Sequence, residues 1–150
     1  MLIKVAPIYI YIYFFILGSN HSVLIVGTKD VLLSIDLSDR SKKTQIQVKN
    51  VMSIGFSSDT NLIYWSNKKE INQLSLQTGV NEVMPFYYND VNSLPFPEGL
   101  AVDWISQKLY WADATRDAIY VGDLRNGRNV QIIEGNLGSP KAIAVSPTTG

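Results

Sequence analysis

The chain has 150 residues, of which 46% are hydrophobic and 17% are charged, a composition typical of one folded domain rather than a disordered chain. Thirteen basic and thirteen acidic residues cancel, so the net charge gives no support for nucleic acid or an anionic membrane surface as a partner. The absence of cysteine and the single histidine, His21, exclude a disulfide framework, a thiolate zinc site and a multi-histidine metal site within this sequence.

The first 22 residues differ in kind from the rest. Lys4 precedes an apolar run from Val5 to Leu17, and the small and polar residues Gly18 to Ser22 follow it. This layout is typical of a secretory signal peptide, and the run is short for a membrane span, which needs about 20 residues. Residues 1–22 are therefore predicted to be a signal peptide and a short linker.

Two other interpretations of this segment stay open. The alternation of Ile and Tyr has the period of a β-strand. An alternating thymine–adenine repeat also translates as alternating Tyr and Ile, so the segment would then be a gene-model artefact. Asn20 begins an Asn-His-Ser sequon and is a candidate glycosylation site.

An internal repeat follows. LIYWSN at residues 62–67 matches KLYWAD at 108–113, with Trp65 and Trp111 46 residues apart. A short apolar run precedes each copy, an alternating run follows it, and Ala142 to Val145 repeats the apolar run once more. Short strands separated by Ser, Asp, Asn and Gly turns, with a period of about 40 to 50 residues, indicate the blades of a β-propeller.

The repeat predicts an all-β fold with about two full four-stranded blades and partial blades at each end. Asn126-Gly127 between two runs is a hairpin-turn signal. The expected boundaries within the incomplete propeller, residues 23–150, are a partial blade at 23–50, blades at 51–91 and 96–136, and the start of another at 137–150.

The aromatic pair and the acid after it have structural explanations. Successive side chains on a strand point to opposite faces, so Tyr110 and Trp111 are expected to be buried against two different neighbours. Asp113 falls where the strand ends and is expected to accept backbone N–H groups of the following turn. Asn67 in the earlier copy offers the same oxygen without a charge. Gly99 and Gly55 are expected to allow close approach between strands.

The segments LIYWSN, GLAVDWISQKLYWAD and SPKAIAVSPTTG resemble the YWTD repeats, also called low-density-lipoprotein-receptor class B repeats. The resemblance covers residues 23–150 and implies part of a six-bladed propeller. The leader that runs straight into a strand pair is most similar to the N-terminal propeller of the receptor-related Wnt co-receptors. The residues that match the structural motif are Tyr64, Trp65, Asn67, Gly99, Asp103, Trp104, Tyr110, Trp111 and Asp113.

The resemblance implies a fragment of an extracellular ligand-binding receptor propeller without enzymatic activity or cofactor. Its partners would be secreted proteins of the Wnt or antagonist type, with no nucleic acid, and its place would be the outer side of the plasma membrane, through a downstream span, or the secreted fraction. In the family, ligands dock on one face of the ring, on turns between strands and at the starts of blades. The positions that match this face are Lys29, Asn50, Pro97, Glu98, Thr115 and Lys141.

The sequence also departs from the family pattern. Ala112 stands where threonine is usual, and Val102 stands where these co-receptors often carry a cysteine. Asn50 and Thr115 replace acidic residues that the family places at such turns.

Two alternative functions remain. One is a secreted matrix propeller of nidogen type. The other is a calcium-dependent, lactonase-type enzyme with Glu98, Asp103 and Asp113 as oxygen ligands, since such calcium sites need no histidine.

Overall fold

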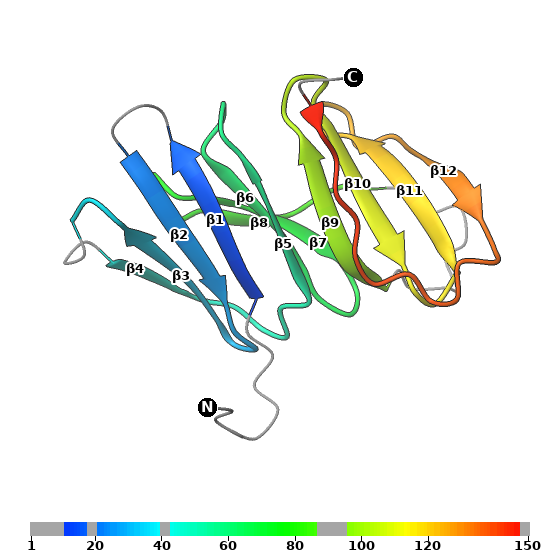
Figure 1. Cartoon of the computed structure of the whole chain (residues 1–150), viewed down its shortest axis with the longest axis horizontal. Helices are drawn as coiled ribbons and strands as arrows, with labels where there is room; N and C mark the ends of the chain where they lie inside the picture. The colour runs from blue at the N-terminus through cyan, green and yellow to red at the C-terminus, as the bar shows by residue number, and fades with distance from the viewer. Residues whose placement is uncertain (1–10, 18–20, 40–42, 87–95, 148–150) are drawn as a thin grey trace. The chain divides into compact units, whose positions relative to one another are not determined.

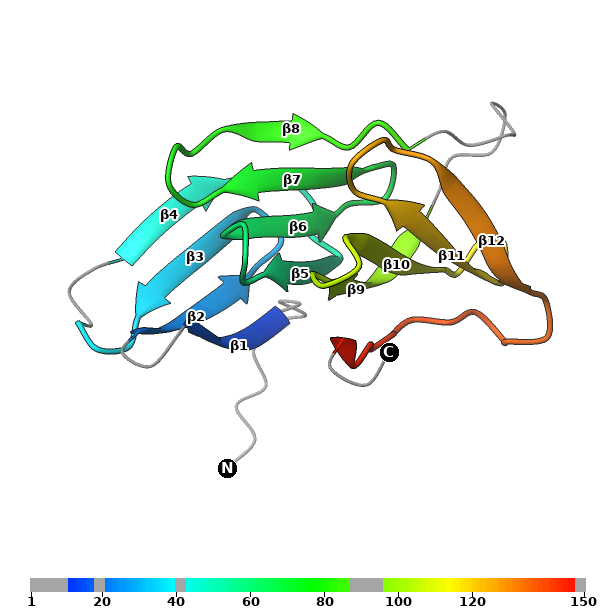
Figure 2. The same cartoon turned by 90° about the horizontal axis from the view of Figure 1, so that it is seen from above.

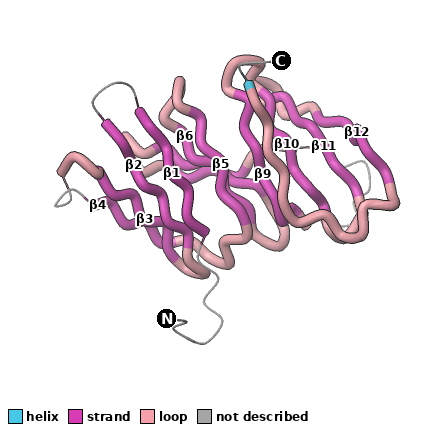
Figure 3. The backbone as a smooth tube through the Cα atoms, in the orientation of Figure 1, coloured by secondary structure: helices cyan, strands magenta, loops and turns pink. Residues whose placement is uncertain are grey.

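The computed structural model describes residues 11–17, 21–39, 43–86 and 96–147, and these residues form twelve β-strands (Figure 3). No helix within these ranges is long and apolar enough to cross a membrane. The chain divides into two compact units, residues 1–51 and 52–150, and each is described by itself. The predicted all-β fold is confirmed.

The first unit is one antiparallel sheet with the strand order β1-β2-β3-β4. Its strands are β1 (Tyr11–Leu17), β2 (His21–Gly27), β3 (Val31–Asp36) and β4 (Lys43–Gln47). Residues 23–50, expected to form a partial blade, contain most of β2 together with β3 and β4, and β1 adds a fourth strand before them.

The added strand comes from the segment that the sequence predicted to be a leader. Strand β1 pairs with β2 along its whole length, from Tyr11 opposite Gly27 to Leu17 opposite His21. The period-two alternation of the segment explains why it can pair in this way. The signal peptide itself stays a prediction, and Asn20, the candidate glycosylation site, lies outside the described residues.

The second unit holds two antiparallel sheets, each with its strands in chain order (Figures 1 and 2). The first blade consists of β5 (Ser53–Ser57), β6 (Leu62–Ser66), β7 (Ile71–Ser75) and β8 (Asn81–Val83). The second consists of β9 (Pro97–Asp103), β10 (Lys108–Asp113), β11 (Ala118–Asp123) and β12 (Asn129–Glu134).

The turns of the two blades share their backbone conformations. Asn61 and Gln107 hold matching positions in the first hairpin of each blade, with φ of 55° and 56°. Gly79 and Gly127 hold matching positions in the third turn, with φ of 73° and 72°. Glycine adopts this left-handed conformation without steric cost, which is why Asn126-Gly127 marked a turn in the sequence.

An apolar core lies between the two blades of the second unit. The first blade and the segment after it contribute Tyr64, Ile71, Met84 and Phe86, and the second contributes Leu100, Val102, Leu109 and Trp111. Trp111 is fully buried, with its ring 5.0 Å from that of Phe86 and stacked at 5.4 Å on that of Tyr120. Tyr110, the next residue on the strand, is only partly buried.

Hydrogen bonds also join β9 to the strands β5 and β6 of the first blade. The Ser66 hydroxyl donates to the carbonyl of Pro97 at 2.7 Å, and the amide of Leu100 donates to the Ser53 hydroxyl at 3.0 Å. Both serines are buried. These bonds matter because a buried polar group without a partner is costly, so the serines fix the register of one blade against the next.

Glycines permit the close approach of successive blades. A Cβ on Gly55 would lie 2.8 Å from the Val102 side chain, and a Cβ on Gly99 would lie 2.9 Å from the Lys141 carbonyl. The segment after β12 thus runs past β9 (Figure 1), as β9 runs past β5.

The segment from Ala142 to Val145 was expected to start another blade as a strand, and it forms no strand. A strand needs a neighbour to accept its hydrogen bonds, and no second strand of that blade lies within the described residues. The segment therefore reaches the inner-strand position beside Gly99 without becoming a strand.

Candidate functional site

Asp113, at the end of β10, is buried and binds the turn that follows it. Its Oδ1 accepts the amides of Thr115 and Arg116, both at 3.0 Å. Its Oδ2 accepts the guanidinium of Arg116 at 2.7 Å and the amide of Phe96 at 3.2 Å. This carboxylate is therefore fully engaged in holding the turn and the entry to β9.

Asn67, at the same place in the other blade, holds its turn in the same way. Its Oδ1 accepts the amides of Lys69 and Glu70 at 2.8 and 3.0 Å. Its Nδ2 donates to the carboxylate of Glu70 at 3.1 Å. Neutral Asn67 is thus followed three residues later by an acid, Glu70, to which its amide donates. Asp113 is followed three residues later by a base, Arg116, which donates to it. In each blade the later residue is a suitable hydrogen-bond partner for the turn acceptor.

Asp103 ends β9 with a similar turn at the other end of the sheet. Its Oδ1 accepts the amides of Ile105 and Ser106, both at 3.1 Å, and its Oδ2 accepts the Ser106 hydroxyl. The Ser106 hydroxyl and amide hold the pKa of this carboxyl below its ordinary value. Trp104 follows it and packs against the core between the blades.

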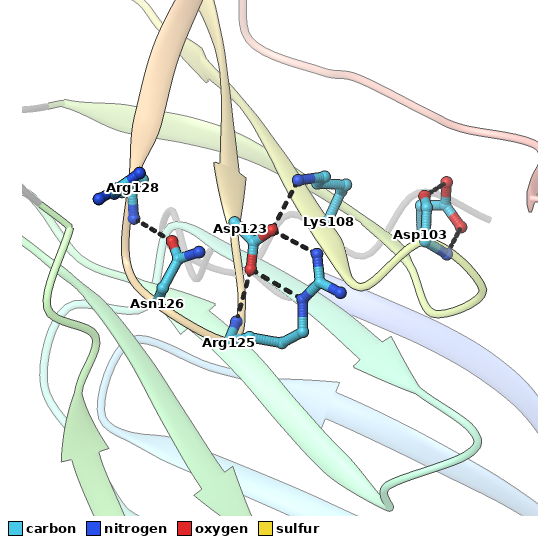
Figure 4. Close-up of polar contacts among 7 residues, drawn as sticks. Asp103, Lys108, Asp123, Arg125, Asn126 and Arg128 are labelled. Atoms are coloured by element: carbon cyan, nitrogen blue, oxygen red, sulfur yellow. Dashed lines mark hydrogen bonds and ion pairs between the residues drawn. The ribbon is translucent and has the colours of Figure 1, made fainter.

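Asp123, at the end of β11, gathers two cationic side chains (Figure 4). The Lys108 ammonium lies 2.7 Å from Oδ2, and the Arg125 guanidinium reaches both carboxylate oxygens, at 2.6 and 3.1 Å. Arg125 first and Lys108 second hold the pKa of Asp123 well below its usual range. The sequence interpretation missed this cluster, although Asp-Leu-Arg-Asn-Gly-Arg was its visible signal.

Three ligand-face candidates lie at the same end of the β9–β12 blade. Glu98 is the second residue of β9, and Thr115 lies in the turn after β10. Lys141 passes Gly99, the residue after Glu98. The Ser139 hydroxyl donates to the Ala114 carbonyl at 3.4 Å, which keeps the segment before Lys141 near the turn that carries Thr115.

Pro97 was also expected on this face, and that expectation is wrong. Its side chain is fully buried, and its carbonyl accepts the hydrogen bond from Ser66. A ring without exposed surface offers nothing to a ligand.

The other two candidates belong to the first unit. Lys29 lies exposed in the turn between β2 and β3, and Asn50 lies exposed after β4 with φ of 57°. They are neighbours, because the amide of Val51 donates to the carbonyl of Lys29 at 3.2 Å. Thr28 takes the place of Asn67 here, since its hydroxyl accepts the amide of Val31 at 3.2 Å.

The acids proposed as calcium ligands in the enzyme alternative are not brought together. Glu98 and Asp103 lie five residues apart on β9, or about 16 Å at the rise of a strand. Asp113 pairs with Pro97, at the Glu98 end. Within the described ranges, no group of three or more His, Cys, Asp or Glu side chains is arranged to hold a metal ion.

Comparison with solved structures identifies the class of fold. A chain of a nidogen/laminin complex matches with a TM-score of 0.69 and 20% identity, over 87% of this chain and 50% of the other. The WD40 repeats of RRP9 match with a TM-score of 0.63 and 16% identity, over 81% of this chain and 38% of the other. The four-stranded sheets are therefore blades of a partial β-propeller, as the sequence predicted.

Sequence comparison identifies the family. Residues 107–146 match the profile of the low-density lipoprotein receptor repeat class B. The low-density lipoprotein receptor-related protein 5 of Mus musculus is 32% identical over 104 residues, which are 69% of this chain and 6% of that protein. The chain belongs to the YWTD-repeat propeller family, as the resemblance implied, and spans a small part of this relative's length.

Proposed function

We propose that this chain is a ligand-binding part of an extracellular receptor propeller related to the low-density lipoprotein receptor. The observation that carries the proposal is the 32% identity with the mouse receptor-related protein, together with the class B repeat at residues 107–146. The relationship supports an extracellular location and protein partners. As finer proposals, the partners are secreted proteins of the Wnt or antagonist type, and the location is the outer side of the plasma membrane or the secreted fraction.

The proposed ligand-binding residues are Glu98, Thr115 and Lys141 in the second unit and, as a separate group, Lys29 and Asn50 in the first. None of these side chains hydrogen-bonds or ion-pairs with another residue in the part of the chain that the structure describes. Preformed turns on a rigid scaffold can bind a partner at little ordering cost. The mechanism is recognition through complementary charge and shape, without chemistry.

We also propose that the protein is not an enzyme. The acidic side chains that a catalyst would need are used in turns, since Asp103 and Asp113 accept hydrogen bonds from their own following residues. Catalysis by carboxylates requires groups that converge on one substrate position, and Asp103 lies at the other end of β9 from Glu98.

A binding assay tests the ligand proposal. The folded chain, immobilised on a biosensor, is expected to bind a secreted Wnt-type protein or antagonist, and charge reversal at Lys141→Glu or Glu98→Lys is expected to weaken binding by roughly 2- to 10-fold. Glu82→Lys, a charge reversal on exposed β8, is the matched control and should leave binding unchanged. Binding that is equal in all variants would contradict the proposed face.

A gain-of-function test introduces acidic residues at two turns where the family carries them and this chain does not. Thr115→Asp and Asn50→Asp restore the charge that the family places at these turns, and both positions are exposed. Each is expected to strengthen binding of a basic ligand, chiefly through a faster on-rate that falls with added salt. A laminin fragment in the same assay tests the matrix alternative, for which the 20% identical nidogen-complex chain supports only the fold.

A further inference from the structure

The third turn of the β9–β12 blade carries basic side chains that the repeat does not need for its fold. Lys108 pairs with Asp123 across the strands in the way that Leu62 pairs with Ser75 in the other blade. The turn after Ser75, residues 76–80, contains no charged residue. It still has Gly79 in the conformation of Gly127. The charges at residues 123–128 therefore require an explanation other than the turn itself.

A pocket of about 260 Å³ lies beside this turn. Its wall contains two cations, two amide side chains and two valines. The lining residues are Lys108, Val121, Gly122, Asp123, Asn126, Arg128, Asn129 and Val130. Cationic side chains thus outnumber carboxylates among these lining residues, and the two valines add apolar surface.

The single carboxylate in the wall is already occupied. Asp123 accepts the amide and guanidinium of Arg125 and the ammonium of Lys108. These bonds hold Lys108, which lines the pocket, beside Asp123 (Figure 4). Asp103, which pairs in register with Lys108, has its oxygens engaged in its own turn.

Arg128 supplies a cation whose guanidinium has no partner among the described residues. Its backbone amide donates to Asn126 at 2.9 Å. Its guanidinium makes no hydrogen bond or ion pair with another residue in the described ranges. Lys108 and Arg125 share the carboxylate of Asp123. Together with Arg128, these four residues therefore carry an excess of positive charge beside the pocket.

We propose that this pocket binds a tetrahedral oxyanion, the sulfate or phosphate group of a larger ligand. The Arg128 guanidinium has the fork geometry for two oxygens, and the Lys108 ammonium adds a second charge. The site is separate from the proposed ligand face. Lys108 begins β10 and Thr115 follows its end, so they are about 17 Å or more apart along the strand.

The test is a titration of the isotopically labelled full chain with sodium sulfate, followed by nuclear magnetic resonance. The amides of residues 126–129 are expected to shift saturably with sulfate and not with sodium chloride at equal ionic strength. Arg128→Gln should weaken the affinity by about tenfold or more, since it removes a charge-assisted donor pair. Arg128→Lys should retain part of it. Lys69→Gln, the same charge change in an exposed turn of the other blade, should have no effect.

Two sugars of the same shape distinguish the source of the oxyanion. Stronger binding of glucose 6-sulfate assigns the pocket to sulfated ligands, and stronger binding of glucose 6-phosphate assigns it to phosphorylated ones. Equal shifts with sulfate and chloride would overturn the proposal. Unchanged sulfate affinity in Arg128→Gln would overturn it as well. Because Arg128 is exposed, this substitution is expected to leave the chain folded.

Discussion

The blades β5–β8 and β9–β12 carry the same aromatic pair, yet their tyrosines have different surroundings. Tyr64 is 3% exposed, and burial raises its pKa to about 12. Tyr110 is only partly buried. The strands β9 and β10 pack on the face of the first blade, whereas at the matching position of the second blade, Gly99, the nearest described atoms belong to residues 141–143, which form no strand. The repeat sets the direction of a side chain, and the neighbouring blade sets its burial.

The largest expected effect is that of Trp111→Ala. Trp111 is fully buried between the blades, so its truncation should lower the free energy of unfolding by about 3–5 kcal/mol. Tyr110→Ala on the opposite face should cost less than half as much, because less buried surface is lost. Urea denaturation followed by tryptophan fluorescence and circular dichroism measures both. Equal losses would show that the two faces are equally packed.

Gly122→Ala tests the packing of Phe86, in the segment after β8, against strand β11 of the second blade. A Cβ at this position would lie 2.3 Å from the ring of Phe86, and such overpacking should cost about 1–3 kcal/mol of unfolding free energy. Phe86→Leu in the same chain should recover part of the loss, because the two positions share one contact. Additive losses in the double variant would contradict this contact.

An exchange of the turn acceptors compares the two blades directly. Asp113→Asn replaces an accepting oxygen by an NH2 group, which then faces the donors of Arg116 or of the turn. Because Asp113 is buried, the free energy of unfolding should fall by about 1–3 kcal/mol. Asn67→Asp brings a carboxylate to Glu70 at a more exposed site and should cost about 0.5 kcal/mol. Glu70→Arg added to Asn67→Asp should restore stability, as the Asp113 turn predicts. Thermal or urea unfolding measures the series.

The smallest expected effect is a loss of stability at low pH that arises from two carboxylates of the β9–β12 blade. Asp123 and Asp103 have pKa values lowered by their hydrogen-bond donors. Each therefore contributes stability that is present above the unfolded pKa of about 4 and lost as the pH falls through the lower folded value. The urea midpoint should fall between about pH 4 and pH 2, and less so in Asp123→Asn. An equal fall in the variant would assign the effect to other carboxylates.

The repeat explains why so much of the fold could be predicted. Strand, turn and side-chain direction depend on residues that are close in sequence, so KLYWAD and LIYWSN were sufficient to place β10, β6 and the turn acceptors. The ligand-face candidates were predicted only by their position in turns or near the start of a strand. Pro97 was predicted by its position, but it is fully buried and its carbonyl accepts a hydrogen bond from Ser66, which lies 31 residues away.

The sequence by itself determined the blades, their order and the family. Tertiary structure decided the points that depend on distant partners. It paired β1 with β2, left Ala142 to Val145 without a strand, and buried Tyr64 more than Tyr110. It also brought Lys108 to Asp123 and Arg128 to one pocket. The physical reason is that hydrogen bonds and burial are completed by neighbours in space, which a local sequence pattern does not specify.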